Sequence, residues 1–208
     1  MTKTFAFIFF SLLLVSCGKG GGGGSNGEEV SLAEVELNAP VPQAALNFDV
    51  QLELANFSSS HERKVYQASE LIKQVIASEE FKDRVIGHVY KGKKQFSNNN
   101  GLTNKQIYKK IIEGSEQLKP GKDNTMNLKL VSYYSGNTVV GYTYPHALNV
   151  WMNEKFLNQY SAAKITTNMI HEWLHKLGFD HDYESTPSRP YSVPYAVGYL
   201  VARLAARI

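Results

Sequence analysis

The strongest pattern in the sequence is the stretch His171-Glu172-Trp173-Leu174-His175-Lys176-Leu177-Gly178-Phe179-Asp180-His181-Asp182. His171 and His175 are four residues apart, so on a helix both rings lie on one face and can reach one metal ion. Glu172 lies beside this pair and can contact a water on the metal rather than the metal itself. Gly178 can adopt a positive φ without steric penalty, so it is expected to end the helix. The chain reversal there can bring His181 back to the same ion.

Three neutral imidazoles leave one position of a tetrahedral zinc ion open for water, which is the arrangement of a catalytic zinc site. The sequence therefore predicts Zn²⁺ bound by His171, His175 and His181. Glu172 is the predicted general base, which takes the proton of the water. The opposite side of the same helix is apolar and is expected to face the core through Ile165, Met169, Trp173 and Leu177.

Strand and helix patterns alternate along the rest of the chain. Alternating polarity from Phe48 to Leu54 predicts a strand, and helical spacing follows from Val65 to Ile76 after the capping residues Ser58 to Ser60. The other expected elements are a helix opened by the capping box of Thr103 and Gln106 and running through Glu113, strands at 126–134, 138–143 and 147–152 with a tight turn at 135–137, and helices at 161–177 and 196–208. Residues 81–96 are ambiguous, because two glycines interrupt any helix there. Together these elements predict an α+β domain in which helices pack on a mixed sheet.

The composition is that of a globular protein. Of the 208 residues, 43% are hydrophobic and 20% are charged, which excludes a fully disordered or collagen-like chain. The formal net charge is +3 and no block of Lys or Arg stands out, so no nucleic-acid partner is predicted. Cys17 is the single cysteine, which excludes an intrachain disulfide and a cysteine-based zinc cluster.

The N-terminus has the pattern of an export signal. Lys3 precedes an apolar run from Phe5 to Val15, which is too short to span a membrane but suits the core of a signal peptide. The run ends in Leu14-Val15-Ser16-Cys17, which resembles a bacterial lipobox. This resemblance implies removal of residues 1–16 and attachment of diacylglycerol, usually with a further acyl chain such as palmitate, to Cys17. An ordinary signal peptide with a chance cysteine is the alternative.

A lipidated Cys17 would anchor the protein to a membrane of the bacterial cell envelope. No Asp follows Cys17, which favours the outer membrane, again by resemblance to lipoprotein sorting. Residues 17–44 are expected to form a flexible tether, because the consecutive glycines Gly20 to Gly24 cannot hold a fixed backbone. The predicted catalytic domain then covers residues 45–208.

The histidine motif resembles that of the metzincin clan of zinc metallopeptidases, His-Glu-x-x-His-x-x-Gly-x-x-His. The resemblance implies a zincin fold with a twisted mixed sheet of about five strands, an active-site helix and a small C-terminal subdomain. It also implies zinc ligation by the three histidines and a role for Glu172 as general base and later acid. Asp182 stands where adamalysin-like members also carry Asp. The segment Val139 to Thr143 resembles the edge strand that binds substrate in this clan.

One feature departs from the clan pattern. Metzincins carry a methionine in a tight turn below the metal, and no methionine follows Met169 here. The candidate turn is Tyr191-Ser192-Val193-Pro194-Tyr195, with Val193 or Pro194 in place of the methionine. Since that turn forms a hydrophobic floor and does not bind zinc, the replacement bears on subfamily placement more than on catalysis. Tyr195 matches the clan's tyrosine that ligates zinc or stabilises the oxyanion; an ordinary packing role is the alternative.

The remaining polar candidates have weaker patterns. His61, His88 and His146 lack partners at ligand spacing and are expected at the surface or as capping residues. Asp180, Asp182 and Glu184 are expected to be structural or to support the ligands, and Asp182 could orient a ligand histidine.

The sequence therefore favours a membrane-anchored, monomeric zinc metalloendopeptidase that acts on protein or peptide substrates. The first alternative is a non-catalytic, zinc-binding surface lipoprotein with a binding role. Glu172 argues against it, because a zinc site kept only for structure needs no carboxylate there. The second alternative is a gluzincin-like peptidase that uses a downstream ligand such as Glu184. The spacing of Gly178 and His181 disfavours this.

Overall fold

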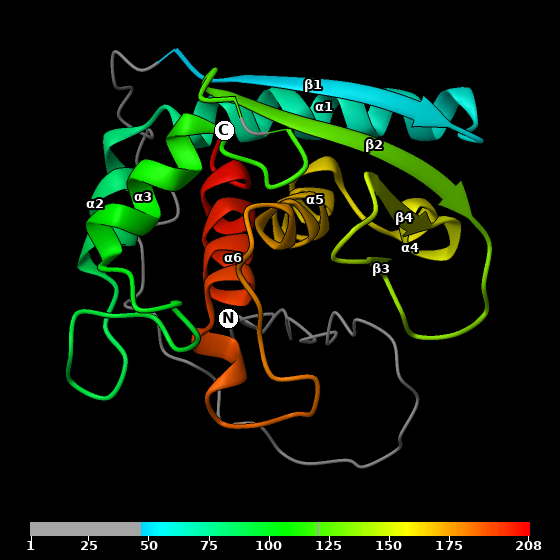
Figure 1. Ribbon diagram of the computed structural model, residues 1–208. Helices are drawn as coiled ribbons and strands as arrows, with labels where there is room; N and C mark the ends of the chain where they lie inside the picture. The colour runs from blue at the N-terminus through cyan, green and yellow to red at the C-terminus, as the bar shows by residue number, and fades with distance from the viewer. Residues whose placement is uncertain (1–46, 120) are drawn as a thin grey trace, which may run out of the picture.

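A mixed sheet of four strands and six α-helices make up the described part of the protein (Figure 1). The structure is a computed structural model that describes residues 47–119 and 121–208. The predicted signal peptide, Cys17 and the tether lie outside the described residues. None of the described helices combines the length and the apolar character needed to cross a membrane.

The strand order of the sheet is β1-β2-β4-β3. The strands are β1 (Asp49–Ala55), β2 (Thr125–Tyr133), β3 (Gly141–Thr143) and β4 (Asn149–Asn153). β1, β2 and β4 are parallel, whereas β3 runs antiparallel to β4 and forms one edge of the sheet. The predicted α+β class with a mixed sheet is confirmed.

The described part has four strands, not the five or so that the resemblance implied. The chain between α1 (Ser59–Ile76) and β2 forms two helices, α2 (Glu79–Gly87) and α3 (Asn104–Glu113), instead of a further strand. The ambiguous start of this region is helical because Ser78 caps α2 while Phe81 and Val85 bury one side of it. The strand expected at 138–143 is shorter than predicted, because residues 135–139 form an irregular loop held by the Asn153 side chain.

The remaining helices are α4 (Glu154–Gln159), α5 (Ala162–Lys176) and α6 (Val193–Ala205), with a 3-10 turn at Arg189–Tyr191 before α6. Side-chain caps fix several helix starts, as the sequence indicated: Thr103 and Gln106 form the expected capping box at α3. α6 begins earlier than predicted, since Pro194 suits the first turn of a helix, where a missing N–H costs nothing.

The core lies between the sheet and the helices α1, α5 and α6. Figure 1 shows α5 end-on below the sheet, with α6 running beside it. The predicted core stripe of α5 is confirmed, since Ile165, Met169, Trp173 and Leu177 are all buried. The buried side of α6 belongs to the same hydrophobic cluster. The C-terminal helix therefore contributes to the same core as the sheet and α5.

Candidate metal centre

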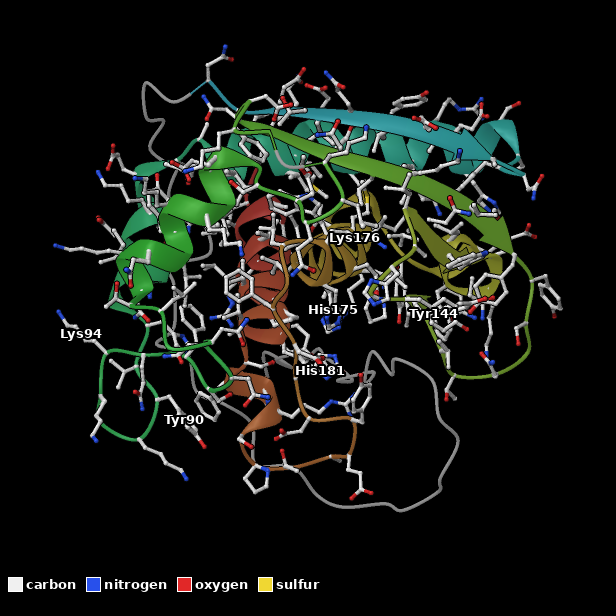
Figure 2. The ribbon with its side chains drawn as sticks, viewed as in Figure 1. Tyr90, Lys94, Tyr144, His175, Lys176 and His181 are labelled. Atoms are coloured by element: carbon white, nitrogen blue, oxygen red, sulfur yellow. The ribbon has the colours of Figure 1, made fainter. Side chains whose placement is uncertain are left out.

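The three histidines of the motif meet near the C-terminal end of α5, where Figure 2 labels His175 and His181. α5 ends at Lys176, and Gly178 follows with a φ of 85°, the left-handed conformation that ends many helices. The amide N–H of Gly178 donates to the carbonyl of His175 and that of Phe179 to the carbonyl of Leu174. This turn returns the chain so that His181 faces the two histidines of the helix.

The distances between the ring nitrogens suit a single ion. The Nε2 atom of His171 lies 3.1 Å from that of His181 and 3.3 Å from that of His175. Nitrogens at zinc-bonding distance in a tetrahedral site are about 3.3 Å apart. The group His171, His175 and His181 could therefore hold a metal ion.

Backbone carbonyls orient two of the three rings. The Nδ1 atom of His175 lies 2.8 Å from the carbonyl oxygen of Phe179, and that of His181 lies 2.9 Å from the carbonyl oxygen of Asp182. An Nδ1–H that donates to a carbonyl leaves Nε2 free of its proton and directed at the metal. The side chain of Asp182 does not take this role: its carboxylate accepts hydrogen bonds from Thr186, Ser188 and Asn98 and so fixes the loop after His181.

Burial keeps the imidazoles in the neutral form that metals bind. Burial lowers the pKa of His171 well below its usual value of 6.5, and the neighbouring histidines lower it further. Burial and then His181 lower the pKa of His175 to about 4. The pKa of His181 is also lowered, mainly by burial. The site therefore does not need to lose protons at neutral pH before it binds a cation.

Glu172 lies next to His171 on α5 but is not in the group of potential metal ligands. Its side chain is 0% exposed, and its Oε1 accepts a hydrogen bond of 3.3 Å from Nδ2 of Asn168, one turn earlier. A Cβ at Gly141 would overlap the amide of Asn168 and lie 2.7 Å from the carbonyl oxygen of Trp151. Glycine at this position therefore lets β3 approach α5 closely. Sequence analysis missed Asn168 and Gly141, although the four-residue spacing from Asn168 to Glu172 was a usable signal.

Tyr195 forms the wall of the centre next to the histidines. Its ring packs edge-on against His171 at a centroid distance of 4.6 Å and lies 4.8 Å from His181. The segment 191–195 is not the tight turn that was expected but the junction between the 3-10 turn and α6. Val193 and Pro194 are buried in the first turn of α6, and the backbone of Pro194 forms a hydrogen bond with His171.

Arg189 is a second residue that sequence analysis missed. Its guanidinium carbon lies 4.9 Å from the centroid of the Tyr195 ring, and its positive charge contributes to the lowered pKa values of His171 and His181. Neither spacing nor composition singles out Arg189, since only the fold brings the 3-10 turn below the centre.

β3, the candidate substrate strand, lies beside α5. The expected edge position of residues 139–143 is confirmed for β3. Lys176 links α5 to this edge, because its Nζ donates to the hydroxyl of Thr143 and to the carbonyl of Ala147. Burial lowers the pKa of Lys176 to about 8. Figure 2 shows Lys176 above the end of α5 and His175 below it.

Of the other predicted residues, Asp180 lies at the centre, where its Oδ1 accepts a hydrogen bond of 2.8 Å from the N–H of His181 and lies 3.9 Å from Nδ1 of His175. His146 is exposed, as expected, and Glu184 is exposed too.

His61 and His88 are buried and not at the surface, and of the two predicted roles His88 has the capping one. His61 is buried with its Nε2 2.8 Å from Oδ1 of Asn158, and His88, the C-cap residue of α2, stacks its ring on Phe96.

Comparisons of the chain with protein-family models, with curated proteins and with solved structures found no match. The fold and the site define it as a mixed α+β protein with a three-histidine group that could hold a metal ion.

Proposed function

We propose that the protein is a zinc-dependent metalloendopeptidase of metzincin type. The observation that carries the proposal is the convergence of three Nε2 atoms on one point, with Glu172 on the same helical turn. Among the His, Cys, Asp and Glu side chains of the described residues, the group consists of three imidazoles alone. Three neutral imidazoles with an open fourth position are typical of a catalytic zinc site, whereas structural zinc sites are closed by four protein ligands.

The chemistry divides between the ion and the chain. Bound zinc supplies an acidified water and polarises the scissile carbonyl. Glu172 takes the proton of the attacking water and passes it to the leaving amine. Asn168 holds the Glu172 carboxylate through its amide, and the ring of Tyr195 holds His171 and His181 from the side. A direct role of the Tyr195 hydroxyl, as zinc ligand or oxyanion donor, stays a prediction from the resemblance.

β3 is the edge on which an extended substrate would lie. The N–H of Asn153 donates to the carbonyl of Val140, which makes these two residues a hydrogen-bonded pair of the antiparallel ladder. Because such pairs alternate along the ladder, Tyr142 directs its backbone groups at β4, while Gly141 and Thr143 direct theirs at the open edge. Among the described residues, β3 pairs with β4 alone. A peptide backbone can therefore add to this edge as a further strand.

We also propose that Cys17 carries the lipid anchor in the cell envelope, with the outer membrane as the favoured location. This proposal is supported by the pattern around residues 14–17 alone.

A second candidate is a zinc-binding surface lipoprotein without catalytic activity. The complete burial of the Glu172 side chain favours it, since a general base must meet a water. The carboxylate itself favours the enzyme, because metal binding without catalysis does not require it.

The Glu172→Ala variant separates the two candidates. All three imidazoles remain, so the metal content should stay near that of the wild type. Removal of the general base should lower peptide cleavage by about 10²- to 10⁴-fold. Glu184→Ala is the matched control: this exposed glutamate follows the motif, and its loss should change neither metal content nor cleavage.

The measurement is cleavage of a peptide library by zinc-loaded protein, with metal content determined on the same samples. Equal cleavage by wild type and Glu172→Ala would show that Glu172 is not the base. A zinc-loaded wild type that cleaves no peptide would favour the non-catalytic lipoprotein. A loss of zinc in Glu184→Ala would instead favour the gluzincin-like alternative.

A further inference from the structure

Three aromatic side chains cluster beside the open edge of the sheet. The ring of Tyr142 in β3 stacks on Trp151 in β4 with a centroid distance of 5.1 Å and an interplanar angle of 10°. Tyr144, just after β3, packs edge-on against Tyr142 at 5.6 Å and against Trp151 at 5.7 Å. We refer to Tyr142, Tyr144 and Trp151 as the aromatic shelf.

The shelf lies on the face of the sheet that points away from the core. Trp151 stands between Val150 and Met152, which are both buried in the hydrophobic core. Because side chains alternate along a strand, Trp151 points to the opposite face. Tyr144 is 59% exposed, and Figure 2 shows it beside β3, away from the end of α5. Exposed aromatic side chains beside a sheet edge that can add a strand are suited to contact with a ligand.

The geometry of strand addition connects the shelf to the metal centre. A peptide on the open edge of β3 alternates its side chains between the two faces of the sheet. One set points toward α5 and the histidines, on the side where Gly141 meets Asn168 and Thr143 meets Lys176. The other set, at every second position, falls on the side of Tyr142 and Tyr144.

We propose that the aromatic shelf selects peptides that carry aromatic or large aliphatic side chains at alternate positions. This specificity rests on the proposed function of β3 as the peptide-binding edge. Each aromatic contact is expected to improve binding by about two- to tenfold, the effect of one aromatic pair. Carboxylate side chains at the same positions lose hydration without gaining a partner on the shelf, so Asp and Glu are disfavoured there.

Intrinsic fluorescence provides a test that does not depend on turnover. The chain has two tryptophans: Trp173 is fully buried in the core, whereas Trp151 is part of the shelf. The test uses the zinc-loaded full chain with Glu172→Ala, so that bound peptide is not cleaved. The first probe is a blocked octapeptide that alternates alanine and phenylalanine. The second has the same composition but carries its phenylalanines in adjacent pairs, so that half of them point away from the shelf.

We expect the alternating peptide to change the Trp151 emission and to bind several-fold more tightly than the paired peptide. Tyr144→Ser should weaken its binding by about two- to tenfold, while Tyr144→Phe should retain it. Tyr66→Ser is the matched control, since Tyr66 is a similarly exposed tyrosine on α1, 52% exposed, and its loss should have no effect. Equal binding of the two peptides, or an unchanged affinity in Tyr144→Ser, would overturn the proposal.

Cleavage by the wild-type protein separates this inference from the proposed function. If peptides are cleaved without preference for alternating aromatic residues, the peptidase stands and the role of the shelf is wrong. If the alternating peptide binds through Tyr144 but is never cleaved, the shelf stands as a peptide-binding site and the peptidase proposal is wrong.

Discussion

At the level of single residues, the backbone carbonyl groups of Phe179 and Asp182 orient two of the histidine rings of the metal centre. They lie at hydrogen-bond distance from Nδ1 of His175 and His181 and so direct Nε2 of each ring at the same point. The ring of His171 is held by its place on the helix, by a hydrogen bond with the backbone of Pro194 and by the ring of Tyr195. Since the carbonyls belong to the turn around Gly178, the ligand geometry depends on that turn as much as on the histidines.

His181→Ala tests the three-histidine site. With one of three ligands removed, zinc affinity should fall by at least about 100-fold, more than the loss of a supporting contact usually costs. Competition with a chelator of known affinity, with metal analysis of the recovered protein, measures the change. His146→Ala is the matched control and should bind zinc like the wild type, because His146 is exposed and outside the group. Unchanged affinity in His181→Ala would mean that another residue is the third ligand.

At the level of elements, the segment between α2 and α3 holds the 3-10 turn that carries Arg189. The amide of Ser97 donates to the carbonyl of Tyr191, and its hydroxyl donates to the carbonyl of Ser188, on either side of Arg189. His88 stacks on Phe96 in the same segment, with ring centroids 4.0 Å apart. The position of Arg189 below Tyr195 therefore depends on a segment that is distant in sequence.

Protonation of His88 should make the stability of the protein depend on pH. Burial lowers its pKa from 6.5 to about 4, so between these values the unfolded chain binds a proton that the folded chain does not. Its contribution to stability is complete above about pH 6.5 and is lost as the pH falls toward 4. The difference corresponds to at most roughly 3 kcal/mol of unfolding free energy.

The measurement is denaturant unfolding of wild type and His88→Phe at pH 7.5 and pH 4.5. Phenylalanine keeps the stack on Phe96 but cannot bind a proton, so the variant should lose roughly 2–3 kcal/mol less than the wild type between the two pH values. The buried histidines of the centre titrate in both proteins and cancel in the comparison. Equal losses in the two proteins would contradict a role for His88.

For the whole molecule, the catalytic proposal and the anchoring proposal concern separate parts of the chain. The histidine centre, Glu172 and β3 all belong to the described residues 47–119 and 121–208, whose buried apolar side chains form one large cluster and a smaller one around Tyr195. Cys17 is placed by sequence pattern upstream of a glycine-rich stretch. Membrane attachment and metal binding should therefore respond to different substitutions.

Cys17→Ser should release the protein from membranes or block its processing, because no acyl chain can then be attached; several acyl chains give stable anchoring. Fractionation of cells that produce the full chain, followed by detection in soluble and membrane fractions, measures the effect. Ser25→Ala, in the same stretch, should stay with the membrane. A Cys17→Ser protein that fractionates with membranes as the wild type does would rule out the lipoprotein proposal. Zinc content should be the same in all three proteins.

Features that depend on neighbours within one element could be predicted from the sequence. The helix of residues 161–177, its buried stripe and the capping box at Thr103 are confirmed. So is the meeting of the three histidines, because four-residue spacing and a glycine turn bring them together within one short stretch of chain. Periodicity and cap chemistry are local, and short-range sterics and hydrogen bonds enforce them.

Only the tertiary structure decided which distant residues complete the centre. Arg189 and the ring of Tyr195 reach the histidines because α6 packs against α5 in the common core, and Gly141 meets Asn168 because β3 lies close to that helix. The number of strands in the described part and the burial of His61 and His88 were also settled there. A sequence pattern records how a residue relates to its own helix or strand. Which elements share a core depends instead on how their apolar surfaces fit together across long stretches of chain.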